Sequence, residues 1–312
     1  MNKLTNKSNM LQEYGSQIAL VLLLLLLSII SPEFRTVNNL LSLLRQSSVN
    51  GLIAFGMTVV ILTGGIDLSV GSTLALTALL GAGMLKGGVP APIAILLVLI
   101  IGIALGVLNG VMVVNGKIQP FIATLVSMTA FRGIAMIFSD GRPISRLGDS
   151  SLLAFLGQGK FLGIPVPVWI MIILFFIFRF FLQNTVIGRD TYATGSNDKA
   201  AALAGISIAK VKYLVYAVSG FTAAFAGLIL VSRLGSAQPT LGSGYELDAI
   251  AAVAVGGTSM NGGRGKILGT LTGVIIIAAL NNGMNIIGIS SYYQQVVKAI
   301  VILLAVLSDR HR

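Results

Sequence analysis

Long apolar runs separated by short polar segments repeat along the whole chain. The runs cover residues 18–30, 48–63, 70–85, 91–114, 118–138, 165–183, 211–231, 247–260, 267–287 and 292–307. A bilayer core about 30 Å thick is crossed by about 20 apolar helical residues, so each run is a candidate membrane helix. The pattern predicts an all-α membrane protein, a polytopic bundle of about ten transmembrane helices in a single transmembrane domain over residues 1–312.

Two details of the pattern concern how these helices are placed. Val37, Leu40, Leu41 and Leu44 recur at helical spacing with polar residues opposite. This pattern fits either a short amphipathic helix at the membrane interface or the start of a long second helix. In the run 91–114, glycines recur every fourth residue, which predicts close helix packing; they are Gly102, Gly106 and Gly110.

The composition supports a membrane protein and excludes several kinds of chemistry. Apolar residues make up 55% of the chain and charged residues 10%, where a soluble domain has about 25%. The chain has no cysteine, and His311 is its one histidine, so we expect no metal site, no redox centre and no catalytic residue. A GxxxxGK[ST] phosphate loop is also absent, so ATP hydrolysis would need a partner protein.

The net charge of +11 comes from basic residues scattered singly between the apolar runs. A nucleic-acid surface would gather them into a stripe, so we expect no nucleic-acid partner. With both termini in the cytoplasm, eleven basic residues fall in inside segments and seven in outside segments. This bias agrees with the positive-inside rule and predicts an inside loop over residues 184–212.

The segment GGIDLSVGS, residues 64–72, places a carboxylate between two apolar runs with no basic residue nearby. Non-helical backbone at membrane depth survives only where protein or a water-filled cavity satisfies it, so Asp67 and Ser69 are candidates to line a translocation path. Alternatively, Asp67 caps the next helix in an ordinary tight turn.

The inside loop contains TGSNDKAAALAGI, residues 194–206. Asn197 suits an N-cap, Asp198 suits the positive end of a helix, and Gly205 suits a left-handed stop. The segment predicts a separate helix of about two turns. Because so short a helix is marginal alone in water, we expect it to dock on the membrane domain or on a partner protein.

A second glycine-rich segment, residues 256–269, is best explained as a hairpin between two membrane helices, although it could also hold an anion. Its glycines at 262, 263 and 269 match those at 64, 65 and 71 at a constant offset, which is either chance or an internal repeat.

Other polar residues lie within or beside the apolar runs. Arg132, Asp248 and Lys298 are candidates for a pathway, because ionisable groups in a membrane usually face the bundle interior. For Lys298 a snorkelling cation is the preferred interpretation. The remaining polar residues are Asn109, Thr124, Gln238, Glu246, Asn281, Asn282 and Asn285.

Four segments together resemble a known family. They are SVNGLIAFGMTVVILTGGIDLSVGS, IQPFIATLVSMTAFRGI, SAQPTLGSGYELDAIAAVAVGGTSMNGGRGKILGTL and ISSYYQQVVKAIVILLAVL. Over residues 31–307 the chain is similar to the membrane permease subunit of bacterial ribose-type ABC importers. The resemblance implies a type II-importer-like homodimer in the bacterial inner membrane, a double-cassette ATPase that binds ATP and Mg, and a periplasmic or lipid-tethered sugar-binding protein.

The resemblance also implies roles for residues. The predicted short helix looks like the coupling helix that docks on the ATPase, with Asn197, Asp198, Lys199, Ala200, Ala201 and Gly205 as its residues. Lys199 stands where related chains tend to have a small residue. The transport cycle would be alternating access for ribose or a related monosaccharide, through a path for which we select Asp67, Ser69, Asn109, Gln238, Asn281, Asn282 and Asn285. The alternative is a stand-alone secondary carrier or channel.

Overall fold

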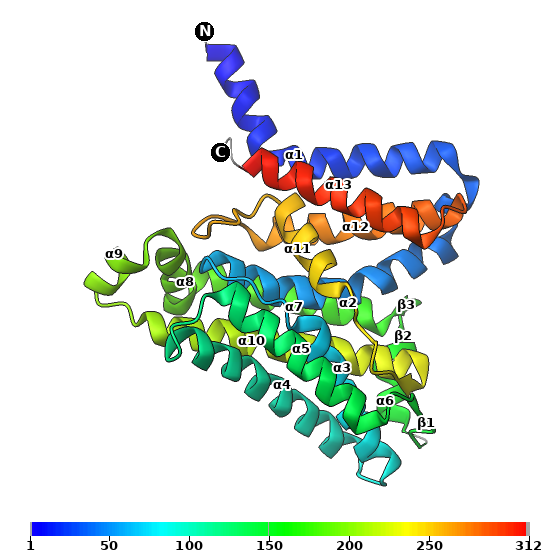
Figure 1. Cartoon of the computed structure of the whole chain (residues 1–312). Coiled ribbons are helices and arrows are strands. Elements are labelled where there is room, and N and C mark those ends of the chain that lie inside the picture. Colours follow the sequence, from blue (N-terminus) through cyan, green and yellow to red (C-terminus); the bar gives the residue numbers. More distant parts are fainter. Residues whose placement is uncertain (1, 149, 310–312) are drawn as a thin grey trace.

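The computed structural model describes residues 2–148 and 150–309, most of which are helical (Figure 1). The described helices are α1 (Asn2–Ile30), α2 (Val37–Leu62), α3 (Val70–Lys86), α4 (Ala91–Val114), α5 (Pro120–Ser139), α6 (Ser151–Gln158), α7 (Val166–Asn184), α8 (Val186–Ser196), α9 (Asp198–Leu203), α10 (Ile208–Leu234), α11 (Tyr245–Val255), α12 (Ile267–Ile286) and α13 (Ser291–Asp309), with a short 3-10 helix over Pro32–Arg35. His311 and the basic residues Arg310 and Arg312 lie outside the described residues.

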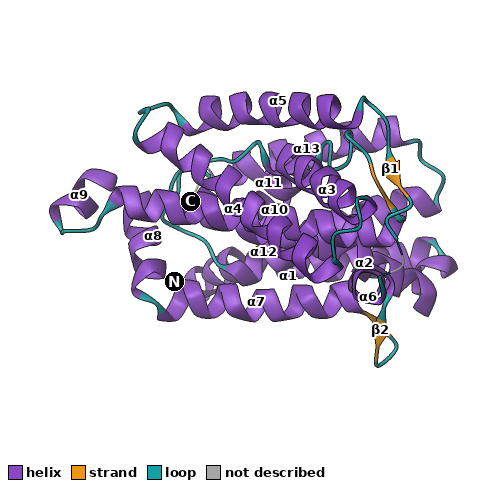
Figure 2. Ribbon diagram, turned by 90° about the horizontal axis from the view of Figure 1, so that it is seen from below, coloured by secondary structure: helices purple, strands orange, loops and turns teal. Residues whose placement is uncertain are grey.

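Four two-residue strands form two small antiparallel pairs. β1 (Ile144–Ser145) pairs with β4 (Ser236–Ala237), and β2 (Lys160–Phe161) pairs with β3 (Ile164–Pro165). These strands and α6 lie at one end of the bundle, whereas α8 and α9 project at the opposite end (Figures 1 and 2). The two ends of the helical bundle therefore differ in structure.

Five helices in the described part of the chain are long and apolar enough to cross a membrane, namely α4, α5, α7, α10 and α12. In α3 and in residues 14–30 of α1 the apolar stretch is shorter. On α4, Leu96 and Ile100 expose more than half of their side chains, which suits a surface that faces lipid. The fold is thus a multi-span helical membrane protein.

One predicted crossing is much shorter than expected. The apolar run 247–260 forms α11, which ends at Val255 after 11 residues. At 1.5 Å per residue this helix is about 16 Å long, roughly half of a bilayer core. The chain leaves the helix at Gly256 and Gly257 and enters the glycine-rich loop, which joins α11 to α12 as the hairpin interpretation predicted.

The segment around Val37 is the start of a long helix and not a separate interfacial one. α2 runs without interruption from Val37 to Leu62, and the Thr36 hydroxyl accepts a hydrogen bond from the backbone N–H of Asn39 at its N-terminus. Its second half is almost completely buried, and it packs against α10, α12, α11 and α7. α2 is therefore the central helix of the bundle.

The glycine spacing in α4 brings this helix close to α10. A Cβ at Gly106 would overlap the carbonyl oxygen of Tyr216, and a Cβ at Gly102 would lie 2.7 Å from the carbonyl oxygen of Gly220. Without those Cβ atoms the two backbones come into direct contact, as the small-residue spacing predicted. This packing places Asn109 of α4 beside α10.

Candidate functional site

A buried polar cluster forms where the loop between α2 and α3 meets two membrane helices. Asp67 is 1% exposed. Its Oδ1 accepts hydrogen bonds from the backbone N–H of Ser69 at 3.0 Å and from the Ser69 hydroxyl at 2.6 Å. Its Oδ2 accepts from the hydroxyl of Ser219, on α10, at 2.7 Å.

α4 completes this cluster. The side-chain amide of Asn109 donates to Ser69 Oγ at 2.8 Å and approaches Asp67 Oδ1 at 3.5 Å. The carboxylate is thus held by hydroxyl and amide donors, which lower the cost of burying its charge. Asp67 fastens the loop to α4 and α10 at once, and it does not cap α3, whose N-cap is Ser69 without a side-chain cap. We call Asp67, Ser69, Asn109 and Ser219 the Asp67 cluster.

Two polar atoms near this cluster are buried and have no hydrogen-bond partner among the described residues. They are Oδ1 of Asn109 and the hydroxyl oxygen of Tyr216. Thr124 of α5 reaches the same loop from another side, since its hydroxyl donates to the carbonyl oxygen of Ile66 at 3.1 Å. The loop therefore has polar contacts with three membrane helices.

The other predicted path residues lie elsewhere. Gln238 is exposed directly after β4. On α12, Asn282 exchanges two hydrogen bonds with Asn39 of α2, at 2.8 and 3.0 Å, and Asn285 accepts one from Gln294 of α13 at 2.7 Å. Asn281 is buried, and its Oδ1 has no partner in the described part of the chain. Of the seven predicted residues, the structure brings together only Asp67, Ser69 and Asn109.

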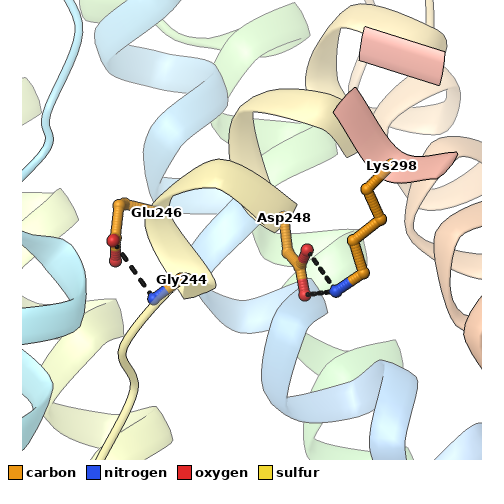
Figure 3. Close-up of polar contacts among 4 residues, drawn as sticks. All are labelled: Gly244, Glu246, Asp248 and Lys298. Atoms are coloured by element: carbon orange, nitrogen blue, oxygen red, sulfur yellow. Dashed lines mark hydrogen bonds and ion pairs between the residues drawn. The ribbon is translucent and has the colours of Figure 1, made fainter. Parts of the chain in front are cut away.

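The pathway candidates Asp248 and Lys298 form an ion pair (Figure 3). Lys298 Nζ, on α13, lies 2.9 and 3.1 Å from the two carboxylate oxygens of Asp248, on α11. The side chain of Lys298 is 24% exposed and that of Asp248 is 10% exposed. The preferred interpretation of Lys298 as a snorkelling cation is therefore wrong, because its charge is paired inside the bundle.

Arg132 and Glu246 stabilise the irregular chain that leads into α11. One guanidinium nitrogen of Arg132 donates to the carbonyl oxygens of Pro239 and Leu241, at 2.6 and 2.9 Å. Glu246 accepts from the backbone N–H of Gly244 at 3.1 Å (Figure 3). These contacts fix the segment between β4 and α11, which has no regular secondary structure.

The short helix of the inside loop forms as the sequence predicted. The Asn197 side chain accepts from the backbone N–H of Ala200 at 2.9 Å, α9 covers Asp198–Leu203, and Gly205 has a φ of 86°. Ala201 is buried, whereas Leu203 is 91% exposed. α9 thus projects from the bundle with the Leu203 side chain open to solvent.

The hydropathy pattern gives no sign of α8, the helix that carries α9. Its N-cap is Thr185, whose hydroxyl oxygen accepts from the N–H of Gly188 at 3.0 Å. The hydroxyl of Tyr192 donates to the carbonyl oxygen of Gly265 in the glycine-rich loop at 2.9 Å. Burial raises the pKa of Tyr192 above its ordinary value, which keeps this donor protonated. The N-cap threonine was the available signal for this helix.

An apolar pocket lies between α7 and α10, lined by Leu174, Ile177, Phe178, Phe181, Val218 and Phe221. It offers no polar side chain to a sugar hydroxyl. Among the described residues, no group of three His, Cys, Asp or Glu side chains lies close enough to hold a metal ion.

A comparison with protein families decides what these features belong to. The profile described as "Branched-chain amino acid transport system / permease component" matches residues 39–306, from the first turn of α2 into α13. The chain belongs to this permease family. Permeases of this family are transport subunits and not enzymes.

Curated relatives of this permease extend over nearly its whole length. It is 54% identical over 301 residues to the ribose import permease protein of Haemophilus influenzae, covering 96% of this chain and 93% of that protein. It is 54% identical over 302 residues to the ribose import permease protein of Bacillus subtilis, covering 97% and 94%. The L-arabinose transport system permease protein of Escherichia coli is 36% identical over 310 residues, covering 96% and 91%. No solved structure matches the permease.

Proposed function

We propose that this permease is the membrane subunit of an ATP-driven ABC importer that moves ribose into the cytoplasm. The observation that carries the proposal is the identity of 54% with ribose import permeases of two different bacteria over almost the whole length of each chain. The E. coli relative named for L-arabinose is less similar, at 36% identity, which favours ribose. A stand-alone carrier or channel is not favoured, because the named relatives are import permeases.

The importer would combine three kinds of component. Two copies of this chain form the membrane path, an ATPase with two cassettes binds ATP and Mg on the cytoplasmic side, and a periplasmic or lipid-tethered protein delivers the sugar. The permease itself holds no cofactor. ATP binding closes the cassettes, and the membrane subunits switch between outward and inward openings by alternating access.

α9 would be the coupling helix that docks on the ATPase. Leu203 offers an apolar contact, and Asp198 and Lys199 place a charge of each sign on the same short helix. The cap formed by Asn197 and the left-handed Gly205 fix both ends of α9, so that a push on it moves the helix as a unit.

The proposed topology has ten membrane segments and cytoplasmic termini in the bacterial inner membrane. The segments are α1 to α5, α7 and α10 to α13, of which α11 enters only part of the way. The end that carries α8 and α9 also holds basic residues of the predicted inside segments, as the positive-inside rule requires; these include Arg189, Lys199, Lys210 and Lys212.

The sugar path would use polar groups without forming a tight sugar site. Gln238 is exposed directly after β4, which pairs with β1 at the end opposite α9, where the sugar would enter. The Asp67 cluster and Asn281 of α12 are buried within one subunit, whereas Asn282 is half-buried and Asn285 is exposed. The buried groups would reach the path only as the helices separate during the cycle.

Uptake by a reconstituted complex tests the proposal. The permease is purified with its co-purifying ATPase, placed in liposomes, and supplied with radiolabelled ribose, a purified ribose-binding protein and internal ATP and Mg. We expect ribose to accumulate only with ATP, and L-arabinose to accumulate poorly. Ribose transport by the permease alone would instead establish the stand-alone carrier.

A further inference from the structure

Three backbone segments meet next to the N-terminus of α9, the proposed coupling helix. They are the end of α8 at Gly195, the end of α2 at Leu62 and the glycine-rich loop at Gly263. The backbone N–H of Gly263 donates to the carbonyl oxygen of Leu62 at 2.9 Å. Gly195 is two residues before Asn197, the N-cap of α9. We call this contact the glycine joint.

No side chain fits inside the glycine joint. A Cβ at Gly195 would overlap the carbonyl oxygen of Leu62 and would lie 2.6 Å from the N atom of Gly263. A Cβ at Gly262 would lie 2.7 Å from the N atom of Gly64. The three segments therefore touch backbone to backbone at Leu62, Gly195 and Gly263.

The joint is braced on both sides. Tyr192, one turn before Gly195 on α8, donates to the carbonyl oxygen of Gly265 and so ties α8 to the glycine-rich loop. On the other side, Gly64 begins the loop that carries Asp67, which is fastened to Asn109 and Ser219. A continuous series of contacts thus connects the α9 end to α4, α10 and α12.

We propose that the glycine joint transmits the displacement of α9 to the loops between α2 and α3 and between α11 and α12. This inference rests on the proposed function, because it assumes that α9 is moved by the ATPase. Packed backbones resist compression and transmit strain, whereas a side-chain contact absorbs small movements by changing rotamer. Gly195 is thus a positioning residue for transport, acting through Leu62 and Gly263.

The test compares the ribose transported with the ATP hydrolysed by the reconstituted complex. Gly195→Ala places a methyl group inside the joint without touching the exposed surface of α9. We expect the complex to assemble and hydrolyse ATP, while ribose transported per ATP falls roughly tenfold, a loss within the usual range for a weakened coupling network. Gly15→Ala is the matched control, because nothing lies within 4 Å of a Cβ there.

A milder variant keeps the test decisive if Gly195→Ala fails to assemble. Tyr192→Phe removes the hydrogen bond to Gly265 and keeps the ring, and we expect a smaller fall, roughly threefold, in ribose transported per ATP. An unchanged ratio in an assembled Gly195→Ala complex, or in Tyr192→Phe where the first variant does not assemble, overturns the inference. If the unmodified complex shows no ATP-driven ribose uptake, the proposed function fails instead.

Discussion

At the scale of single residues, Asp67 shows how a charge is accommodated inside this bundle. Among the described residues its carboxylate has no basic partner within hydrogen-bonding distance, and three hydroxyl and amide side chains surround it instead. Hydrogen bonds to a charged acceptor are stronger than those between neutral groups, so this arrangement holds the loop firmly to α4 and α10.

Asp67→Asn tests this contribution. The amide exchanges one acceptor oxygen for a donor, so at least one of the groups that now donate to Asp67 loses its acceptor or must turn away. We expect the free energy of unfolding in detergent to fall by about 1–3 kcal/mol and ribose uptake to fall with it. Ser42→Ala is the control, since that exposed hydroxyl only donates to Asn38 in its own helix. An unchanged thermal midpoint would contradict the assigned role.

Gly205→Val tests the end of the coupling helix. Gly205 has a φ of 86°, and nothing lies within 4 Å of a Cβ there, so the substitution acts through the backbone alone. A β-branched residue disfavours this conformation by roughly 1–2 kcal/mol. We expect ATP-driven uptake to be lost while membrane insertion stays normal, and Gly15→Val to leave both unchanged. Uptake at the normal rate would exclude this role for Gly205.

At the scale of elements, α9 and α11 are both short, for different reasons. α9 is specified by its local sequence, because the N-cap Asn197 and the left-handed Gly205 lie directly at its two ends. α11 ends within an apolar run, where Gly256 meets the backbone of α12: a Cβ at Gly256 would overlap the carbonyl oxygen of Gly269. Capping residues therefore predicted α9 well, whereas hydropathy extended α11 too far.

Leu203→Ser tests α9 as a docking element. The side chain is 91% exposed in the permease, so the change should not alter the fold of the subunit. We expect roughly tenfold weaker association with the ATPase, because an apolar contact buried in an interface is worth about 1–3 kcal/mol. Binding is measured by titrating the ATPase against permease in nanodiscs. Leu162→Ser, at an exposed leucine between β2 and β3 at the other end of the bundle, should bind normally. Equal affinities would exclude Leu203 from the interface.

At the scale of the whole molecule, a charged pair joins the last helix, α13, to α11. Asp248 of α11 and Lys298 of α13 are 50 residues apart in sequence and mostly buried (Figure 3). Burying two charges is costly, but removing only one of them is worse, because the other is left unpaired in a medium of low dielectric. The pair therefore fixes the position of α13 more than it adds net stability.

A double-mutant cycle tests this pair. We expect Lys298→Met to lower the free energy of unfolding by on the order of 3 kcal/mol. The double variant, Asp248→Leu with Lys298→Met, should regain most of that lost free energy. Arg142→Met is the control, because its partner Asp140 and Arg142 itself are both highly exposed, and the change should leave stability unaltered. Additive effects of the two changes would show that the side chains do not interact.

Several features follow from the sequence alone: the class of protein, the approximate positions of most of the long helices, the cap and stop of α9 and the glycine contacts of α4. These features depend on residues that are neighbours in the chain or on one helix face, where composition and period are sufficient. The tertiary structure decided which polar groups meet. Ser219 joins Asp67, Asn39 joins Asn282, and Asp248 joins Lys298, because helices distant in sequence pack together. The glycine joint likewise exists only where three separate backbones approach each other, and no local pattern specifies that approach.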